Sequence, residues 1–406
     1  MRYIGISLND DYTGICVNEE GQLTSIPTVV CKEKNKDHWL IGEAAYKSTL
    51  TGSGVIVDKL LSLLRKDGTA TIEKVRYSAV RLLGFFLKEL LQDCGEDLIV
   101  VSIRKPELRM MHLIREALLS AGAAEDKIYI ISHTESFVHF VLKQDKNLYN
   151  RLVGMFELSN QCLYYYEMRV SKGARQYVMA DSEAQEEAFN LDILKTASGG
   201  KIADKILCSL AERVLAKKSY SSVFLSGKGF ENTAYAANFM NILCNRRRVC
   251  IEPDMFAIGA MIYADQVGRK EPEEYTILCD TRVGCDVSVR VQVHEKEENL
   301  PIVTAGSSWV NMRSSYEMIL DNQNYIDFAV APMIGFNRRP IRMRMLLDGF
   351  PERENRTTRI QMTTEFADSR RLRVIVRDKG FGELFPAQGM TLTEEIDLTK
   401  AMEKKD

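Results

Sequence analysis

Several features that define common protein classes are scarce in this sequence. It has nine cysteines with no CxxC pair, and only nine prolines, which argues against a disulfide framework and against a zinc site. Charge of one sign is not in excess either, since 54 Lys+Arg stand against 56 Asp+Glu and the net charge is −2. A nearly neutral chain has no overall attraction to phosphate backbones or anionic lipids, so we expect neither nucleic acid nor a membrane as partner.

Long hydrophobic runs are also missing. The chain opens with Met1, Arg2 and a short apolar run that soon turns polar, which is too short for a secretory segment. No run approaches the roughly 20 residues needed to span a bilayer. The remaining composition, 45% hydrophobic and 27% charged, is typical of a soluble globular protein, and 406 residues suffice for two or three domains. With reduced thiols expected, we predict a cytoplasmic location.

Strand and helix signals alternate over about the first 268 residues. Short apolar runs at 3–8 and 14–18, with a further extended run to Val30, predict a hairpin or meander. Apolar residues at spacings of three and four predict a helix over about 71–93. From Leu152 the same succession begins again, strands first and then strand–helix alternation. This repetition predicts a duplicated α/β domain.

The character of the sequence changes after the charged segment 269–274. Residues 275–399 hold alternating runs, of which 287–293 and 372–377 are the clearest, and they predict an all-β sandwich. Arginines are frequent over 338–377, where they alternate with apolar residues. We interpret them as the solvated face of a sheet, with an anion-binding face as the alternative.

The order of motifs resembles the DnaK-type heat-shock chaperones of the actin-like ATPase superfamily. Two segments look like that family's phosphate-binding hairpins, the first at Tyr3–Asp11 and the second at Phe156–Gln161. Between them, Leu98–Ala121 with Ile128–Leu142 looks like its first connecting element. After them come segments that look like its Gly-Gly segment (Ala197–Asp204), its adenosine motif (Val223–Phe230) and its closing helix (Pro253–Ala260). In the second domain, Leu346–Pro351, Glu365-Phe366 and Leu372–Gly380 look like the family's peptide-binding sandwich.

The resemblance implies an actin-like, duplicated ribonuclease-H-like domain over 1–268 and a substrate-binding-type β-sandwich over 275–399. Only residues 202–222 separate the Gly-Gly segment from the adenosine motif, enough for one helix and a turn. The family has a whole lobe there, which holds adenine. We therefore expect a domain that lacks one adenine-side lobe, and a chain without the family's helical lid.

The phosphate hairpins depart from the family pattern. Glycines let backbone N–H groups approach phosphate, and a carboxylate holds hydrated Mg²⁺. In the first hairpin Ser7 replaces the family's Asp and Asn9 its Gly. Asp10 and Asp11 occupy positions of small hydroxyl residues, where their charges would repel ATP.

The second hairpin keeps a carboxylate but loses its glycines. Glu157 replaces the family's Asp, while Ser159 and Asn160 replace glycines. Glu135 could stand in for the catalytic carboxylate. Lys59 either matches the phosphate-side lysine or is an ordinary solvent-facing lysine. The remaining candidates for nucleotide contacts are Gly199, Gly200, Gly227 and Gly229.

Other polar and aromatic groups suggest ordinary roles. His133 and His139 are six residues apart, which is not a metal spacing on a helix, so we predict no metal site. The three tyrosines 164–166 lie in a predicted strand, and we expect the outer two rings to be buried and the middle one to point outward. The run 246–248 of three arginines is interpreted as a solvated turn.

These departures favour a degenerate DnaK-like protein that binds a peptide or protein partner without nucleotide or other cofactor. One alternative is a working ATPase that uses ATP and Mg²⁺. In it, Asp10 or Asp11 would hold the metal, Glu157 would lie opposite, and Glu135 would orient the attacking water. The second alternative is an actin-like structural or scaffold protein.

Overall fold

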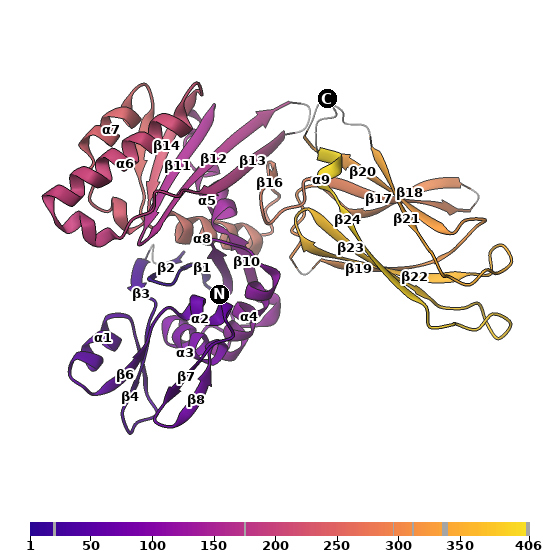
Figure 1. Cartoon of the computed structure of the whole chain (residues 1–406), viewed down its shortest axis with the longest axis horizontal. Coiled ribbons are helices and arrows are strands. Elements are labelled where there is room, and N and C mark those ends of the chain that lie inside the picture. Colours follow the sequence, from indigo (N-terminus) through magenta and orange to yellow (C-terminus); the bar gives the residue numbers. More distant parts are fainter. Residues whose placement is uncertain (19–21, 174–175, 295, 311, 335–339, 403–406) are drawn as a thin grey trace. The chain divides into compact units, whose positions relative to one another are not determined.

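We describe a computed structural model of the chain (Figure 1). It describes residues 1–18, 22–173, 176–294, 296–310, 312–334 and 340–402. The chain divides into two compact units, residues 1–275 and residues 276–406, which we call the first and second unit. No helix in the described ranges is both long and apolar enough to cross a membrane.

The first sheet of the first unit combines a three-stranded meander with two parallel strands. Its order is β10-β9-β1-β2-β3. The strands are β1 (Tyr3–Leu8), β2 (Tyr12–Val17), β3 (Gln22–Pro27), β9 (Leu98–Ile103) and β10 (Ile128–Ser132). β1, β2 and β3 pair antiparallel, whereas β9 lies parallel to both β1 and β10. Every residue of β9 is buried, as expected of a central strand covered on both faces.

The second sheet repeats this arrangement. Within the first unit its order is β15-β14-β11-β12-β13. The strands are β11 (Leu152–Ser159), β12 (Cys162–Lys172), β13 (Gln176–Ala184), β14 (Tyr220–Ser226) and β15 (Arg248–Ile251). Again the first three strands are antiparallel and the last two parallel. Both sheets therefore have one strand order and one set of strand directions, as a duplicated α/β domain requires.

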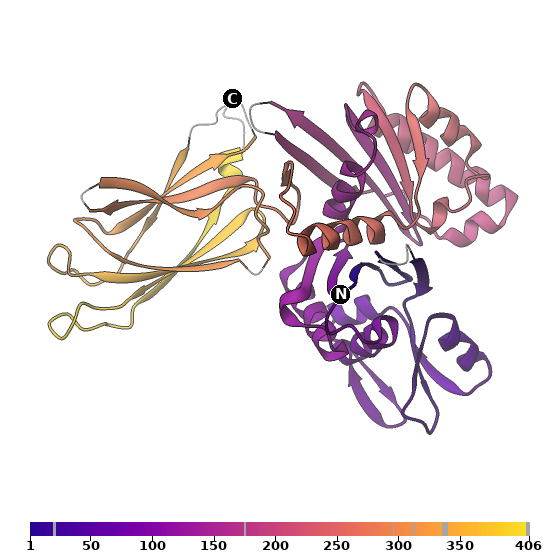
Figure 2. The same ribbon diagram turned by 180° about the vertical axis from the view of Figure 1, so that it is seen from behind.

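Helices cover both sheets, and two of them lie between the sheets (Figures 1 and 2). α3 and α4 pack together beside the first sheet, α6 and α7 pack on the outer face of the second, and α5 and α8 cross between them. Their bounds are α3 (Ala79–Leu91), α4 (Leu108–Ala121), α5 (His133–Leu142), α6 (Ala197–Leu215), α7 (Ala237–Cys244) and α8 (Met255–Gly268).

Two glycines allow α8 to lie directly against its neighbours. A Cβ atom on Gly259 would overlap the carbonyl oxygen of Ser136 in α5. A Cβ atom on Gly5 would overlap the backbone nitrogen of Met261 in α8. Backbone-to-backbone contact of this kind is possible only where no side chain intervenes.

The chain between β3 and α3 forms a small subdomain. It consists of β4 (Val30–Glu33), β5 (Trp39–Ile41), α1 (Gly42–Leu50), β6 (Gly54–Val57), α2 (Leu60–Arg65), β7 (Thr69–Ile72) and β8 (Val75–Ser78). The helix predicted over about 71–93 was therefore placed too early. Glu73 and Lys74 adopt positive φ, which turns the chain into a β7–β8 hairpin, and the helix begins at Ala79 behind its cap Ser78.

The stretch 202–222 forms the rest of α6, a turn and the start of β14, which confirms the predicted helix and turn. The prediction for the three tyrosines was wrong. The middle ring, Tyr165, is buried and packs with Phe156, while Tyr166 is buried on the opposite face and Tyr164 is half-buried. Both faces of β12 are covered, so alternation does not leave one face in solvent.

The second unit is rich in β-structure and contains two antiparallel four-stranded sheets. Their orders are β18-β17-β20-β21 and β19-β22-β23-β24. The unit begins with β16 (Thr276–Leu278) and ends with α9 (Thr399–Met402). The sheets consist of β17 (Cys285–Val293), β18 (Lys296–Val303), β19 (Arg313–Ile319), β20 (Tyr325–Pro332), β21 (Ile341–Leu346), β22 (Arg359–Asp368), β23 (Arg371–Asp378) and β24 (Thr391–Asp397).

Burial alternates along the strands of the second unit, most clearly in β20 and β22, so each sheet has one inner and one outer face. Arginines of the outer faces are paired with acids. Arg344 contacts Asp327, and Arg373 contacts Glu395. This agrees with the solvated sheet face expected for the arginine-rich stretch, although residues 338 and 339 lie outside the described part.

Candidate functional site: a charged cleft between the two sheets

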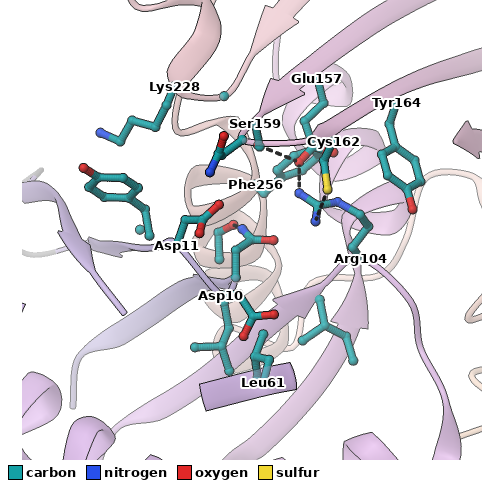
Figure 3. Close-up of a pocket in the computed structure, with 18 of the residues that line it drawn as sticks. Asp10, Asp11, Leu61, Arg104, Glu157, Ser159, Cys162, Tyr164, Lys228 and Phe256 are labelled. Carbon is teal, nitrogen blue, oxygen red and sulfur yellow. Dashed lines mark hydrogen bonds and ion pairs between the residues drawn. The ribbon is translucent and has the colours of Figure 1, made fainter. Parts of the chain in front are cut away.

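A cleft of about 450 Å³ opens where the β1–β2 and β11–β12 hairpins turn (Figure 3). It also lies beyond the carboxyl ends of the parallel strands β9 and β14, from which Arg104 and Gly227 follow. Ligands of α/β sheets usually bind at this edge of the strands. α2 lines a further part of the cleft.

Charged side chains of both signs line the cleft. Five are cationic and four are anionic: Lys59, Arg65, Arg104, Lys105 and Lys228, with Asp10, Asp11, Glu157 and Asp254. Cationic side chains therefore accompany Asp10 and Asp11, whose charges were expected to repel ATP.

A buried ion pair joins the two halves of the cleft. The Arg104 guanidinium donates to Oε1 of Glu157, whose side chain is only 2% exposed. The same guanidinium donates to Sγ of Cys162 at 3.8 Å and lies 5.2 Å from the centre of the Tyr164 ring. Arg104 directly follows the last residue of β9, so this buried strand positions the guanidinium group in the cleft.

Both oxygens of Glu157 are engaged. The Tyr166 hydroxyl donates to Oε2 at 2.6 Å, and the Ser159 hydroxyl reaches Oε1 at 3.4 Å beside Arg104. Burial alone would raise the pKa of Glu157, but the charge of Arg104 outweighs it and the pKa is lowered below its usual range. Glu157 is therefore a carboxylate whose lone pairs are used inside the protein.

His133 lies behind this carboxylate. Its Nδ1 atom is 3.9 Å from Oε2 of Glu157, and its ring stacks on Phe256 with 4.0 Å between centres. Complete burial lowers the pKa of His133, so the imidazole is neutral. Arg104 thus remains the cation that balances Glu157.

Asp10 turns towards α2. Its carboxylate accepts hydrogen bonds from the backbone N–H of Ser62 at 2.9 Å and from the Ser62 hydroxyl at 2.5 Å. Since Ser62 lies in the first turn of α2, the aspartate satisfies an otherwise unpaired N–H group there. Asp10 therefore fastens the hairpin turn to the small subdomain.

Asp11 lies in the cleft and is half-buried. Burial, followed by the charge of Asp10, raises the pKa of Asp11, while Lys59 and Arg104 oppose this shift. Nearby, the Asn9 amide donates to the Ser7 hydroxyl at 3.3 Å, so these two replacements in the first hairpin are bonded to each other.

The structure brings most of the predicted site residues together. Eight of them line the cleft along with Gly227: Ser7, Asn9, Asp10, Asp11, Lys59, Glu157, Ser159 and Asn160. Asn160 also stabilises the local backbone, because its side-chain oxygen accepts a hydrogen bond from the N–H of Leu191 at 3.2 Å. Gly227 has φ of 91°, and a Cβ there would lie 2.5 Å from the carbonyl oxygen of Leu158.

Four predicted residues lie elsewhere. Glu135 is buried in α5 with its carboxylate 3.8 Å from Nε2 of His139. The remaining three are glycines in packed positions. Gly199 fits against Ile193, Gly200 against Tyr235, and Gly229 against the Leu158 side chain.

The Gly-Gly segment also contributes a buried carboxylate, Asp204. It accepts from the N–H of Phe239 at 2.9 Å and from the Asn238 amide at 2.7 Å, and so caps α7. In the described ranges, no three His, Cys, Asp or Glu side chains are grouped so as to hold a metal ion.

Sequence reasoning missed Arg104 and Tyr166, the two strongest partners of Glu157. A signal for Arg104 exists, because a charged residue directly after a fully buried strand is placed at the ligand-binding edge of the sheet. No such signal marks Tyr166, whose ring packs against Phe137 of α5 and Phe256 of α8.

The structure defines a protein with a duplicated α/β unit, a charged cleft and a β-rich second unit. Residues 11–280 match the family described as "Family of unknown function (DUF5716) C-terminal", about two thirds of the chain, and the chain belongs to this family. Residues 282–398 match a domain of unknown function (DUF8552).

No curated protein matches. A solved structure of a non-polymerising MamK mutant bound to AMPPNP is similar at 11% identity and a TM-score of 0.45, over 65% of this chain and 98% of that chain. These findings do not single out the DnaK-type chaperones.

Proposed function

We propose that the first unit is an actin-like domain whose nucleotide site has lost metal-dependent catalysis, and that the protein acts by binding another polypeptide. The repeated strand order of the two sheets supports the duplicated ribonuclease-H-like fold that this class requires. The motif order, which resembles that of the DnaK-type chaperones, supports the same fold. Because a fold does not define a function, the proposed function rests on the cleft.

The Arg104–Glu157 pair is the observation that carries the proposal. A Mg²⁺ site needs carboxylate oxygens that are open to the hydrated ion. Glu157 is the carboxylate of the second hairpin, and both its oxygens accept hydrogen bonds from protein groups. Arg104 supplies a permanent positive charge where a metal would otherwise compensate the carboxylate.

The first hairpin supports the same conclusion. Asp10, a candidate metal ligand of the ATPase alternative, is bound to Ser62 at the start of α2. Glu135, the candidate for orienting water, lies outside the cleft lining. Of these candidates, Asp11 lies in the cleft without such a bond, and Asp254, directly before α8, also lines the cleft. Glu157, the carboxylate expected opposite Asp11, is already paired with Arg104, which leaves the metal site of the ATPase alternative incomplete.

A loop of the second unit supports the proposal that the protein binds another polypeptide. We call residues 379–390 the tip loop. It exposes Phe381, Leu384 and Met390, with Leu384 exposed by 88%. We infer that these three apolar side chains form part of the surface that binds the partner.

The tip loop is also held in place. Asp378, at the end of β23, accepts from the N–H groups of Gly380 and Gln388 at 3.0 and 2.9 Å. Arg353 forms two hydrogen bonds of 2.8 Å to Asp378 and a third to the carbonyl oxygen of Pro386. A loop fixed in this way loses little conformational entropy when a partner binds.

Phosphate release from ATP by the intact chain tests the catalytic half of the proposal. We expect no Mg²⁺-dependent turnover above that of Glu157→Gln, which keeps the shape of the side chain and removes its charge. Turnover that requires Mg²⁺ and falls in Glu157→Gln would establish the ATPase alternative. The scaffold alternative has no separate support in the structure.

A further inference from the structure

A second recess lies at the opposite end of the second sheet from the cleft. It has a volume of about 360 Å³ and lies at the amino ends of β14 and β15, whereas the cleft lies at the carboxyl ends. Charged and amide side chains make up most of its lining: Asn147, Asn150, Arg151, Arg246, Arg247 and Arg248. The run of three arginines that the sequence suggested to be a solvated turn thus forms one wall.

The charge of this recess is of one sign. Four arginines line it and no acid does. Arg246 and Arg248 are exposed, and neither has an ion pair or side-chain hydrogen bond to another described residue. Elsewhere on the protein, exposed arginines such as Arg344 and Arg356 lie against aspartates. Four guanidinium groups without acids repel one another, so an anion would stabilise them.

Two of the four guanidinium groups are held in position by the protein. Arg247 donates to the carbonyl oxygen of Ile242 at 3.1 Å and lies 5.9 Å from the centre of the Tyr220 ring. Arg151 donates to the Ser219 hydroxyl at 3.1 Å. Side chains fixed in this way lose less entropy when a ligand binds.

We propose that this recess binds a compact, multiply charged phosphate group of the pyrophosphate class. Guanidinium groups bind phosphate oxygens through paired, directed hydrogen bonds, and the neighbouring amides of Asn147 and Asn150 can donate further ones. The volume suits a small ligand. The site lies in the first unit but is separate from the cleft, and the proposal does not depend on the function proposed above.

Two other anionic ligands fit less well. Binding of single-stranded nucleic acid relies on exposed aromatic rings that stack on bases, and Tyr220, the aromatic residue of this recess, is only 3% exposed. An acidic peptide would need an extended groove, whereas the four arginines converge on one small recess.

Calorimetric titration of the intact chain with pyrophosphate at low salt tests the proposal. We expect saturable binding that weakens at least tenfold in the double variant Arg246→Ala/Arg248→Ala. Both side chains are exposed, so an unchanged melting temperature is expected to show that this variant folds. The double variant Arg246→Lys/Arg248→Lys keeps the charge but not the paired hydrogen bonds, and it should also bind more weakly than the parent.

The matched control is Lys201→Ala/Lys205→Ala on the exposed side of α6, which removes the same charge from the same half of the unit. This control should leave pyrophosphate binding unchanged. No saturable binding, or an equal loss in both alanine variants, would overturn the proposal. Tighter binding of a poly-glutamate peptide or an oligonucleotide than of pyrophosphate would overturn the ligand class.

Discussion

Glu157 keeps its charge in a place that solvent hardly reaches because the Arg104 guanidinium lies against it. The sequence could identify Glu157, since its position in the second hairpin marks it. It could not show that the partner would be Arg104 rather than a metal ion, because Arg104 lies 53 residues earlier in the chain, directly after β9. Side chains that meet through tertiary packing leave no local pattern.

Replacement of Arg104 by Ala should destabilise the first unit. It leaves the Glu157 carboxylate buried without its counter-charge, and removal of one partner of a buried pair costs about 3–5 kcal/mol. Denaturant unfolding measures this loss. The double variant Arg104→Met/Glu157→Gln removes both charges and should be more stable than Arg104→Ala. If the loss in Arg104→Met/Glu157→Gln equals the sum of the losses in Arg104→Met and in Glu157→Gln, the pair is not coupled as we describe.

Asp378 should make the stability of the second unit depend on pH. Its hydrogen bonds with Arg353, followed by backbone bonds, outweigh its burial and lower its pKa from 3.8 to about 2. A carboxyl group with a lowered pKa stabilises the fold fully above its unfolded value, and this contribution disappears as the pH falls through the folded value.

The free energy of unfolding of the parent minus that of Asp378→Asn should therefore be constant above about pH 5. Between about pH 4 and pH 2 it should decline, as follows from the two pKa values. Chemical denaturation at a series of pH values measures it. A difference that stays constant down to pH 2 would contradict the role given to this carboxylate.

At the scale of elements, the contact between α5 and α8 holds the middle of the first unit together. Gly259 in α8 lies directly on the backbone of Ser136 in α5. On either side of it, His133 stacks on Phe256 and His139 stacks on Tyr263. The sequence marked α8 only as a closing helix, because periodicity shows which residues are apolar and not which backbone they touch.

Gly259→Ala should be strongly destabilising, since its Cβ would overlap the carbonyl oxygen of Ser136 and a backbone cannot yield as a side chain can. We expect a loss of at least about 2 kcal/mol, measured by thermal or denaturant unfolding. Gly95→Ala is the matched control, because its Cβ would be 3.6 Å from the nearest atom. Equal stabilities of the two variants would show that α5 and α8 do not approach so closely.

The extent of α3 shows why element boundaries were harder to predict than elements. Ile72, Val75 and Ala79 continue the helical spacing of the residues that follow, although the first two belong to a hairpin. The left-handed φ of Glu73 and Lys74 decides the boundary. Neither residue type favours that conformation, so the sequence carried no warning.

At the scale of the whole molecule, the repeated order of strands and helices predicted the duplication, and both sheets have it. Repetition of buried strands and amphipathic helices is a long-range property that a single sequence displays well. The β-rich second unit was equally visible, from the alternation along its strands. The pairing of charged side chains in the cleft could not be predicted, because it depends on hydrogen bonds between residues far apart in the chain.

The tip loop gives a prediction for the intact protein. Leu384→Ser should lower its binding to immobilised apolar peptides several-fold without changing its melting temperature, because the side chain is 88% exposed. Leu50→Ser is the matched control, since Leu50 is 87% exposed in the first unit. Equal losses in the two variants would mean that the tip loop is not a specific surface.

The central claim is that the cleft does not bind nucleotide through a metal ion. Calorimetric titration of the intact chain with Mg-ATP tests it most directly, with Glu157→Ala as the comparison. We predict no saturable heat from the parent protein in the micromolar range. Saturable micromolar binding that requires Mg²⁺ and is abolished by Glu157→Ala would contradict the account.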